Sequence, residues 1–432
     1  MGTATKRHAE RAVSMDALAF TNTHDLAAAL GATMNLINPV VESHHERVAY
    51  LSYLMACELH MDVEMHLVTV AAALMHDVGA LFSEEQTDSL DFELRADELS
   101  QIGADMMGGL PFFDKVADVV RYCQRPWLAS ADYQQLKVPM PFASSVVHLA
   151  DAAAICLKAD VPALNQREEI VELIAEGTGT TFHPQVVEAF REVARRDYVW
   201  MDLLYHPHRL MDMIPSQPLS LEQTVDLTRV MSRFIDYRSA FTAMHSAGVS
   251  ASAVRLAELI GMGEDECAMM RIAGNLHDLG KIRTPRAILE KPGRLTDEEF
   301  NVIKEHAYFT HRILSQIEGF ERICDWAALH HEKLNGTGYP FRLEARQLSL
   351  GSRIMAVADI FSAITEERPY RAGMSREKAI SVMQDNVANG AISARVVEVL
   401  LDHYDDVNAC RAEASEAEGQ RYLRTIRRQQ AE

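Results

Sequence analysis

The chain repeats one arrangement of polar residues inside otherwise apolar sequence. The shared order is a histidine, then a His-Asp pair about 30 residues later, then a distant aspartate. Its members are His45, His76, Asp77 and Asp151 in the first half and His245, His277, Asp278 and Asp359 in the second. The first histidine precedes the pair by 31 residues in one copy and by 32 in the other. A repeat of this length indicates a tandem duplication of one domain.

Apolar residues recur at helical spacing around both copies. The segment 296–317 opens with Thr296 and Glu299, which form a capping-box pattern, and its apolar residues then follow a helical period. Alternating strand patterns bounded by turn residues are scarce. The sequence therefore predicts an all-α protein built from two helical domains.

The domain boundaries follow from the repeat and from the prolines. We expect the first domain at residues 20–195 and the second at residues 222–410. The stretch 196–221 carries two proline-containing breaks and is predicted to be a linker. Residues 411–432 are predicted to be a charged C-terminal tail.

Composition limits the partners and the location. The formal net charge is −20, and apart from a short tail the basic residues form no block, so no duplex nucleic-acid partner is expected. No run of about 18 apolar residues predicts a membrane helix. The N-terminus has no clear secretory signal, and the six cysteines are scattered without a CxxC pair. We therefore expect a cytoplasmic protein with reduced thiols and no membrane contact.

The second half gathers donors that suit metal ions. Five histidines and two aspartates lie on several predicted helices: His245, His277, Asp278, His306, His330, His331 and Asp359. Imidazole and carboxylate together suit Fe, Mn, Zn or Ni, and the absence of cysteine argues against a structural zinc site. An aspartate directly after a histidine can bridge two metals while the histidine binds one. This set therefore predicts a two-metal site.

Two metal ions would give this site a hydrolytic chemistry. They can bind phosphate oxygens and lower the pKa of a bridging water, and the resulting hydroxide attacks a phosphoester. Lys281 follows Asp278 by one helical turn and would neutralise charge developing on the phosphate. The alternative for Lys281 is a surface lysine with its stem on apolar neighbours.

A glycine-rich loop follows the paired histidines in HHEKLNGTGYP, residues 330–340. Gly336 and Gly338 permit a positive φ or a close backbone approach, and Pro340 stiffens the exit. An aromatic side chain held there can stack on a base or cover it. Further on, Arg368 and Arg371 are spaced so that both could face one anion. The alternatives are an ordinary helix connection for the loop and a solvated edge for the two arginines.

HDLGKI followed by HHEKLNGTGYP resembles the HD-GYP family, a branch of the HD metal-phosphohydrolases, and the resemblance covers about residues 235–385. It implies hydrolysis of bacterial cyclic dinucleotides, chiefly c-di-GMP, with some members preferring cyclic GMP–AMP. It also implies that the seven donors above are metal ligands and that four residues contact substrate, namely Lys281, Tyr339, Arg368 and Arg371. The implied cofactors are two divalent ions, Fe or Mn first, with Ni or Zn as alternatives.

Two departures from the family pattern matter in the second domain. Phe241 occupies the position where some members have a glutamate ligand for a third metal, so we expect two metals. Asn335 replaces the usual acidic residue of the loop and is expected to affect loop anchoring.

The first domain departs further. Ala80 occupies the position of Lys281, Cys123 and Gln124 replace the paired histidines, and no GYP loop follows. We interpret it as a degenerate HD domain retained for packing, for regulation or for contacts within a homodimer.

The leading hypothesis is a metal-dependent phosphodiesterase that opens c-di-GMP or 3',3'-cyclic GMP–AMP to its linear dinucleotide. Two alternatives remain. One is a non-catalytic sensor or scaffold that binds the cyclic dinucleotide. The other is a nucleotide phosphohydrolase of the kind found elsewhere among HD proteins, which the GYP loop disfavours.

Overall fold

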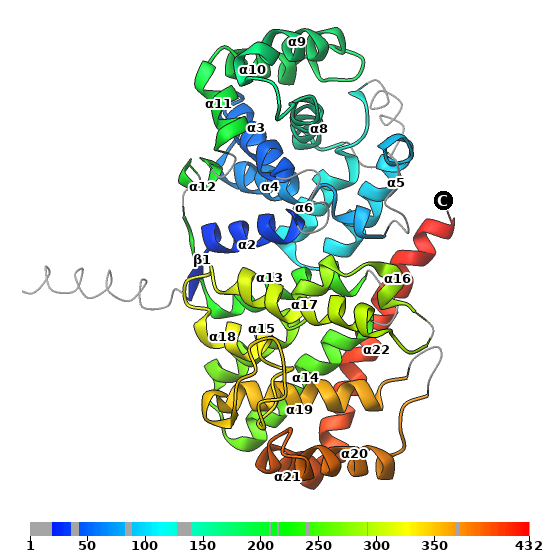
Figure 1. Ribbon diagram of the computed structural model, residues 1–432. Helices are drawn as coiled ribbons and strands as arrows, with labels where there is room; N and C mark the ends of the chain where they lie inside the picture. The colour runs from blue at the N-terminus through cyan, green and yellow to red at the C-terminus, as the bar shows by residue number, and fades with distance from the viewer. Residues whose placement is uncertain are drawn as a thin grey trace, which may run out of the picture. The chain divides into compact units, whose positions relative to one another are not determined.

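The computed structural model describes residues 20–35, 43–82, 89–127, 140–206, 209–213, 216–237, 242–291, 293–367 and 372–431. These residues are almost entirely helical (Figure 1), which confirms the all-α prediction. Two short strands, β1 (Thr21–Asn22) and β2 (Pro218–Leu219), pair antiparallel with Thr21 opposite Leu219. Within the described ranges, none of the helices combines the length and the apolar character needed to span a bilayer.

The chain divides into two compact units. The N-terminal unit is Leu30–Pro215, and the C-terminal unit combines Met1–Ala29 with Ser216–Glu432. Helix α2 (Thr23–Asn35) crosses this boundary, and its first half is held to the C-terminal unit by the β1–β2 pairing.

The N-terminal unit is a helical assembly. Its elements are α3 (His44–Glu58), α4 (Val63–Met75), η2 (Val78–Phe82), α5 (Ser89–Met107), α6 (Pro111–Tyr122), α8 (Phe142–Ile155), α9 (Ala163–Glu176), α10 (Pro184–Ala194), α11 (Asp197–Tyr205) and α12 (Arg209–Met213). Helices α3, α4 and α8 pack against one another through residues such as Val48, Val68 and Val147, none of which is exposed. Burying these aliphatic side chains is the main stabilising contribution to such a core.

The C-terminal unit is larger. Its elements are α13 (Leu221–Asp236), α14 (Thr242–Ile260), α15 (Glu264–Leu276), η4 (Leu279–Arg283), α16 (Arg286–Leu289), α17 (Asp297–Leu314), α18 (Glu321–Ala328), η5 (Ala345–Gln347), α19 (Leu350–Thr365), α20 (Arg376–Ala388), α21 (Ala394–Asp402) and α22 (Tyr404–Ala431). Helix α14 contacts α15, α19 and α22. Gly274 lets α15 approach α14 closely, because a Cβ there would lie 2.5 Å from the Cα of Ser250.

The residues expected to form the linker are partly helical. Helix α11 packs in the N-terminal unit, with Trp200 and Leu203 buried. The guanidinium of Arg47 donates to the Leu203 carbonyl at 2.8 Å, and the Tyr50 hydroxyl donates to Asp202 at 2.8 Å. The prolines marked the breaks in this stretch, but the apolar spacing around Trp200 builds a packed helix.

The residues expected to form a charged tail also differ from that expectation. Residues 411–431 belong to α22, a helix that packs on α14. Ser415 donates to the Met244 carbonyl at 3.1 Å, and Glu418 accepts from Arg233 at 3.1 Å and from Tyr237 at 3.0 Å. The segment therefore contributes buried residues to the packing, among them Arg411, Ser415 and Tyr422.

Two local predictions are confirmed. Thr296 caps α17, and its hydroxyl accepts from the Glu299 amide while the Glu299 carboxylate accepts from the Thr296 amide. All six cysteines are free thiols.

Candidate metal centre

Seven donor side chains of the C-terminal unit converge from separate helices. Helix α14 supplies His245, the end of α15 supplies His277 and Asp278, α17 supplies His306, the segment after α18 supplies His330 and His331, and α19 supplies Asp359. Three groups of these residues have ligand atoms within 4.8 Å of one another: His306 with His330 and His331, His245 with His277 and Asp359, and His277 with Asp278 and His330. The structure therefore brings all seven predicted donors together.

Backbone contacts orient the imidazole rings. His277, His306 and His330 each donate from Nδ1 to the carbonyl oxygen three residues earlier, at 2.8, 2.6 and 2.6 Å. A carbonyl can only accept, so Nδ1 carries the proton and the lone pair of Nε2 faces the cluster. The Nε2 atom of His277 is buried without a hydrogen-bond partner among the described residues. Such a lone pair fits a metal ion.

The carboxylate of Asp278 lies between His277 and His306. Its Oδ2 atom is 3.3 Å from Nε2 of His277, and its Oδ1 atom is 3.4 Å from Nε2 of His306. Lys281 donates to Oδ2 at 2.6 Å. A carboxylate whose two oxygens face different imidazoles has the geometry that bridging two metal ions requires.

The electrostatics of the cluster favour neutral imidazoles at His306 and His330 beside an ionised Asp278. Burial lowers the pKa of His306 to about 4 and that of His330 to about 3. Burial alone would raise the pKa of Asp278, but His277 and Lys281 outweigh it and hold that pKa well below its usual range. Neutral imidazole and ionised carboxylate are the forms that bind metal.

His245 differs from the other rings because carboxylates face both of its nitrogens. Its Nε2 is 3.2 Å from Asp359 Oδ1, and its Nδ1 is 3.4 Å from Glu366 Oε2. Burial would lower the pKa of His245, yet these two carboxylates raise it to about 10. Glu366, just past the end of α19, is thus a ring-orienting residue that the sequence reasoning missed, since no motif marks it.

Glu332 is a second residue without a role in the sequence reasoning, although it belongs to the HHE stretch. Its buried carboxylate accepts backbone N–H donors from three successive residues, Phe341, Arg342 and Leu343, at 2.6, 3.1 and 3.0 Å. Charge-assisted bonds of this kind are among the stronger hydrogen bonds in proteins. Glu332 therefore fixes the exit of the GYP loop.

The GYP loop has the backbone geometry expected of its glycines. Gly336 has a φ of 75°. A Cβ at Gly338 would lie 2.4 Å from the backbone nitrogen of Lys333, so only glycine fits. The Asn335 amide donates to the Asn389 carbonyl at 2.9 Å, and its oxygen accepts from Thr337. Asn335 therefore anchors the loop.

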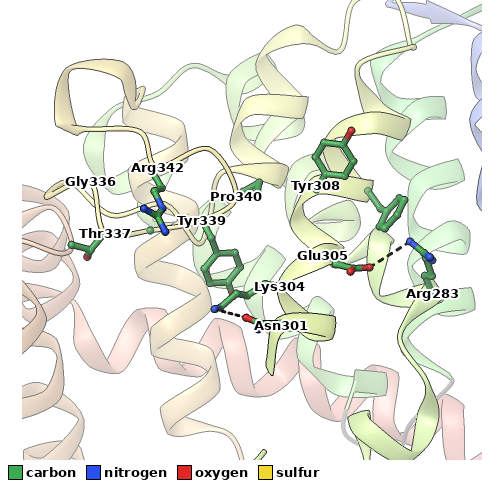
Figure 2. A pocket seen from close by; sticks show the side chains of 12 residues that line it. Arg283, Asn301, Lys304, Glu305, Tyr308, Gly336, Thr337, Tyr339, Pro340 and Arg342 are labelled. Carbon is green, nitrogen blue, oxygen red and sulfur yellow. Dashed lines mark hydrogen bonds and ion pairs between the residues drawn. The ribbon is translucent and has the colours of Figure 1, made fainter. Parts of the chain in front are cut away.

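A cavity of about 830 Å³ lies between the GYP loop and α17. Figure 2 shows Tyr339 and Lys304 in its middle, Arg342 on the loop and Arg283 paired with Glu305 at the other end. The Tyr339 ring also packs on His331, with ring centroids 4.7 Å apart. Tyr339 thus joins the cavity to the donor cluster.

Some predicted positions lie outside the described residues. These are the two arginines Arg368 and Arg371 and the position of the missing third-metal glutamate, Phe241.

Among the described residues of the N-terminal unit, no histidines stand in the places of His306, His330 and His331. A Cβ at Gly280 would lie 2.1 Å from the carbonyl oxygen of His306, and one at Gly79 would lie 1.8 Å from that of Leu99. Leu99 therefore occupies the place of His306, a substitution that spacing did not reveal. Gln124 donates to Asp151 Oδ2 at 3.0 Å, much as His331 faces Asp359 Oδ2 at 3.9 Å.

The structure also corrects the pairing of the first histidines. Nε2 of His44 lies 3.0 Å from Asp151 Oδ1, as Nε2 of His245 lies 3.2 Å from Asp359 Oδ1. His44, rather than His45, is therefore the counterpart of His245. Both histidines lie in the first turn of α3, and the spacing agrees with this pairing, because His44 precedes His76 by 32 residues, as His245 precedes His277.

Comparison with known proteins also finds one domain in each of the two units. An HD domain model matches residues 229–396, and a second HD domain model matches residues 41–156. The 3'3'-cGAMP-specific phosphodiesterase 1 of Vibrio cholerae is 28% identical over 83% of this chain and 86% of its own length. The 3'3'-cGAMP-specific phosphodiesterase 3 of the same organism is 31% identical over 66% of this chain and 62% of its own length. A cyclic di-GMP phosphodiesterase of Thermotoga maritima is 35% identical over 41% of this chain and 48% of its own length.

A solved structure has the same fold over most of the chain. The crystal structure of the cyclic GMP-AMP specific phosphodiesterase V-cGAP3 of V. cholerae aligns with a TM-score of 0.58 and 22% identity, over 89% of this chain and 98% of that one. The chain therefore belongs to the HD domain family and carries two HD domains in tandem, the second of the HD-GYP type.

Proposed function

We propose that this chain is a metal-dependent phosphodiesterase that hydrolyses a bacterial cyclic dinucleotide to its linear dinucleotide. The observation that carries the proposal is the position of Asp278, whose two oxygens face different histidines beside Lys281. Two divalent ions held by the seven donors, most simply Fe or Mn, would supply Lewis acidity and activate a water for attack on phosphorus.

The chain's own residues supply orientation and charge. The backbone carbonyls that hold three imidazole rings keep the cluster preorganised. The Lys281 ammonium stabilises negative charge that develops on the phosphate. Arg368 and Arg371 are assigned to phosphate binding. The Tyr339 ring, next to His331, closes the substrate site on the side of the GYP loop.

The cavity beside α17 is proposed to take the half of the substrate that is not being cleaved. Three cationic side chains line it, Arg283, Lys304 and Arg342, against one carboxylate, Glu305. This balance suits an anionic ligand in a chain that is acidic overall. Aromatic side chains on α17 and the loop offer surfaces on which a base can stack.

We propose 3',3'-cyclic GMP–AMP as the first substrate to test, with c-di-GMP second. Among the relatives compared above, those that align with both units are 3'3'-cGAMP-specific enzymes, whereas the cyclic di-GMP enzyme aligns over less than half of the chain. A cytoplasmic location agrees with the six free thiols.

The test is to load the full chain with Fe, Mn, Ni or Zn separately, incubate it with each cyclic dinucleotide and resolve the products by chromatography. A linear dinucleotide is expected with at least one metal. If every metal-loaded form binds the ligand without converting it, the chain is a sensor and the proposal fails.

A further inference from the structure

The residue two positions after the GYP motif has an unusual backbone conformation. Arg342 has a φ of 56°, in the left-handed region that residues with a Cβ rarely adopt. The Glu332 carboxylate holds this conformation, because it accepts the amide of Arg342 at 3.1 Å and those of its two neighbours at 2.6 and 3.0 Å. Glycine would adopt it at lower cost. Strained residues of this kind cluster at ligand sites, so the side chain of Arg342 is a candidate for ligand contact.

The side chain of Arg342 is exposed and lines the cavity between the GYP loop and α17. In Figure 2 it lies on the loop beside Tyr339. The Tyr339 ring in turn packs on His331, with ring centroids 4.7 Å apart. Arg342 is therefore close to the side chain that joins the cavity to the donor cluster.

The three cations that line the cavity differ in their partners. Arg283 pairs with Glu305 at 3.4 Å and packs on an aromatic ring. Lys304 donates to the Asn301 side chain at 3.0 Å and also packs on an aromatic ring. Among the described residues, the Arg342 guanidinium has no hydrogen-bond, carboxylate or ring partner. The chain has 62 acidic residues against 42 basic ones, so an arginine without a carboxylate partner is available to a ligand.

We propose that Arg342 binds the half of the cyclic dinucleotide that is not being cleaved, through two parallel hydrogen bonds from its guanidinium. This inference rests on the proposed function, since that function places the uncleaved half in the cavity. The guanidinium presents a planar fork of donors that matches two neighbouring acceptor atoms. Two groups of a cyclic dinucleotide offer such a pair, namely the second phosphate and the O6/N7 edge of a guanine.

Arg342 acts on binding and not on the chemical step. Lys281 is the cation bonded to Asp278, whereas no hydrogen bond or ion pair joins Arg342 to any of the seven described donors. Its removal should therefore raise KM and leave kcat near normal. An arginine that only stabilised the loop would behave in the opposite way, because its loss would lower stability and leave KM unchanged.

The test compares Arg342→Gly with wild type in the metal-loaded full chain, with 3',3'-cyclic GMP–AMP as substrate. KM is expected to rise about 10- to 150-fold, as the loss of a charged hydrogen bond predicts. The melting temperature should stay the same or rise, because glycine relieves the left-handed φ. Metal content, measured by elemental mass spectrometry, should not change.

Two further variants separate the guanidinium from its charge and from its surroundings. Arg342→Lys should give a KM between those of wild type and Arg342→Gly, because an ammonium keeps the charge without the fork of donors. The matched control is Arg346→Ala, which removes an exposed arginine four residues further on, outside the lining of the cavity. It should match wild type, and an equal rise in KM there would overturn the assignment to Arg342.

Two further substrates locate the contact. Bis(4-nitrophenyl) phosphate has a single phosphodiester and no base, so Arg342→Gly should hydrolyse it as wild type does. A loss on this substrate as well would mean that the substitution acts on the metal centre, and would overturn the inference. Cyclic di-AMP has both phosphates but no guanine. A loss of affinity confined to the guanine-containing dinucleotides identifies the guanine edge, whereas an equal loss with cyclic di-AMP identifies the second phosphate.

Failure of this inference differs from failure of the proposed function. An unchanged KM in Arg342→Gly, beside an active wild type, overturns the inference and leaves the proposed function intact. If wild type binds the dinucleotide without converting it, the proposed function fails, and dissociation constants from isothermal titration calorimetry replace KM in the same comparison. A wild-type chain that neither binds nor converts a cyclic dinucleotide refutes both.

Discussion

The two units share a scaffold but differ in the donors that surround it. Both place a His-Asp pair after a helix. In both, a glycine follows the pair at a position where a Cβ would collide with a backbone carbonyl, Gly79 or Gly280. In the C-terminal unit the facing segments add His306, His330 and His331. In the N-terminal unit they add a leucine, a cysteine and a glutamine. The comparison teaches that one HD scaffold can be surrounded by different sets of donors, and that three side chains and one loop make the difference.

The largest expected effect is at Asp278, which would hold both metal ions. Asp278→Ala should reduce turnover below detection and lower bound metal, because it removes the group that lies between His277 and His306. His331→Ala should do the same. Turnover assays are paired with elemental analysis. The matched Asp77→Ala change should leave turnover within a few-fold of wild type, and full activity with full metal in Asp278→Ala would contradict the site.

The next effect is at the lysine that the N-terminal unit lacks. Lys281→Ala should lower kcat roughly 100- to 1,000-fold with metal content unchanged, because it removes the cation beside Asp278 that we propose to stabilise the reacting phosphate. The reciprocal Ala80→Lys change should create no activity in a chain that carries Asp278→Ala, since Leu99, Cys123 and Gln124 remain. A rate near that of wild type in Lys281→Ala would mean that this ammonium faces solvent during turnover.

A smaller effect is expected at the two arginines after α19. Arg371→Ala and Arg368→Ala should each lower kcat/KM about 10- to 150-fold, as the loss of a charged hydrogen bond of about 1.5–3 kcal/mol predicts. Metal content should not change. Steady-state kinetics on both variants decide the matter, and unaltered constants in both would remove these residues from phosphate recognition.

The smallest effect concerns the GYP loop, which has no counterpart in the N-terminal unit. Glu332→Gln should lower the free energy of unfolding by about 1–3 kcal/mol and raise KM, because three backbone donors lose their ionised acceptor. Denaturant unfolding and initial rates measure the two quantities. Glu398→Gln on α21 is a control that removes an exposed charge only. Equal behaviour of the two variants would mean that Glu332 does not hold the loop.

Several features could be predicted from residues close together in the chain. The helices follow from apolar spacing, and the start of α17 follows from Thr296 and Glu299. The position of the donor cluster followed from His277-Asp278 and from HHE with its GYP loop, because adjacent polar residues in an apolar run need a shared partner.

Other features depended on which side chains meet across distant segments. The contact that identifies His44 is with Asp151, more than 100 residues away, although the 32-residue spacing from His44 to His76 already favoured it over His45. The N-terminal unit has Leu99 at the position of His306. This correspondence could be identified only from the close approach of Leu99 to Gly79.

By itself the sequence determined the fold class, the duplication and the donor types, because helical periodicity and ligand chemistry are local properties. Only the tertiary structure decided the roles of Glu366 and of Glu332. A buried carboxylate or imidazole acquires its function from the atoms within about 4 Å of it. Those atoms come from helices that the chain brings together only when it folds.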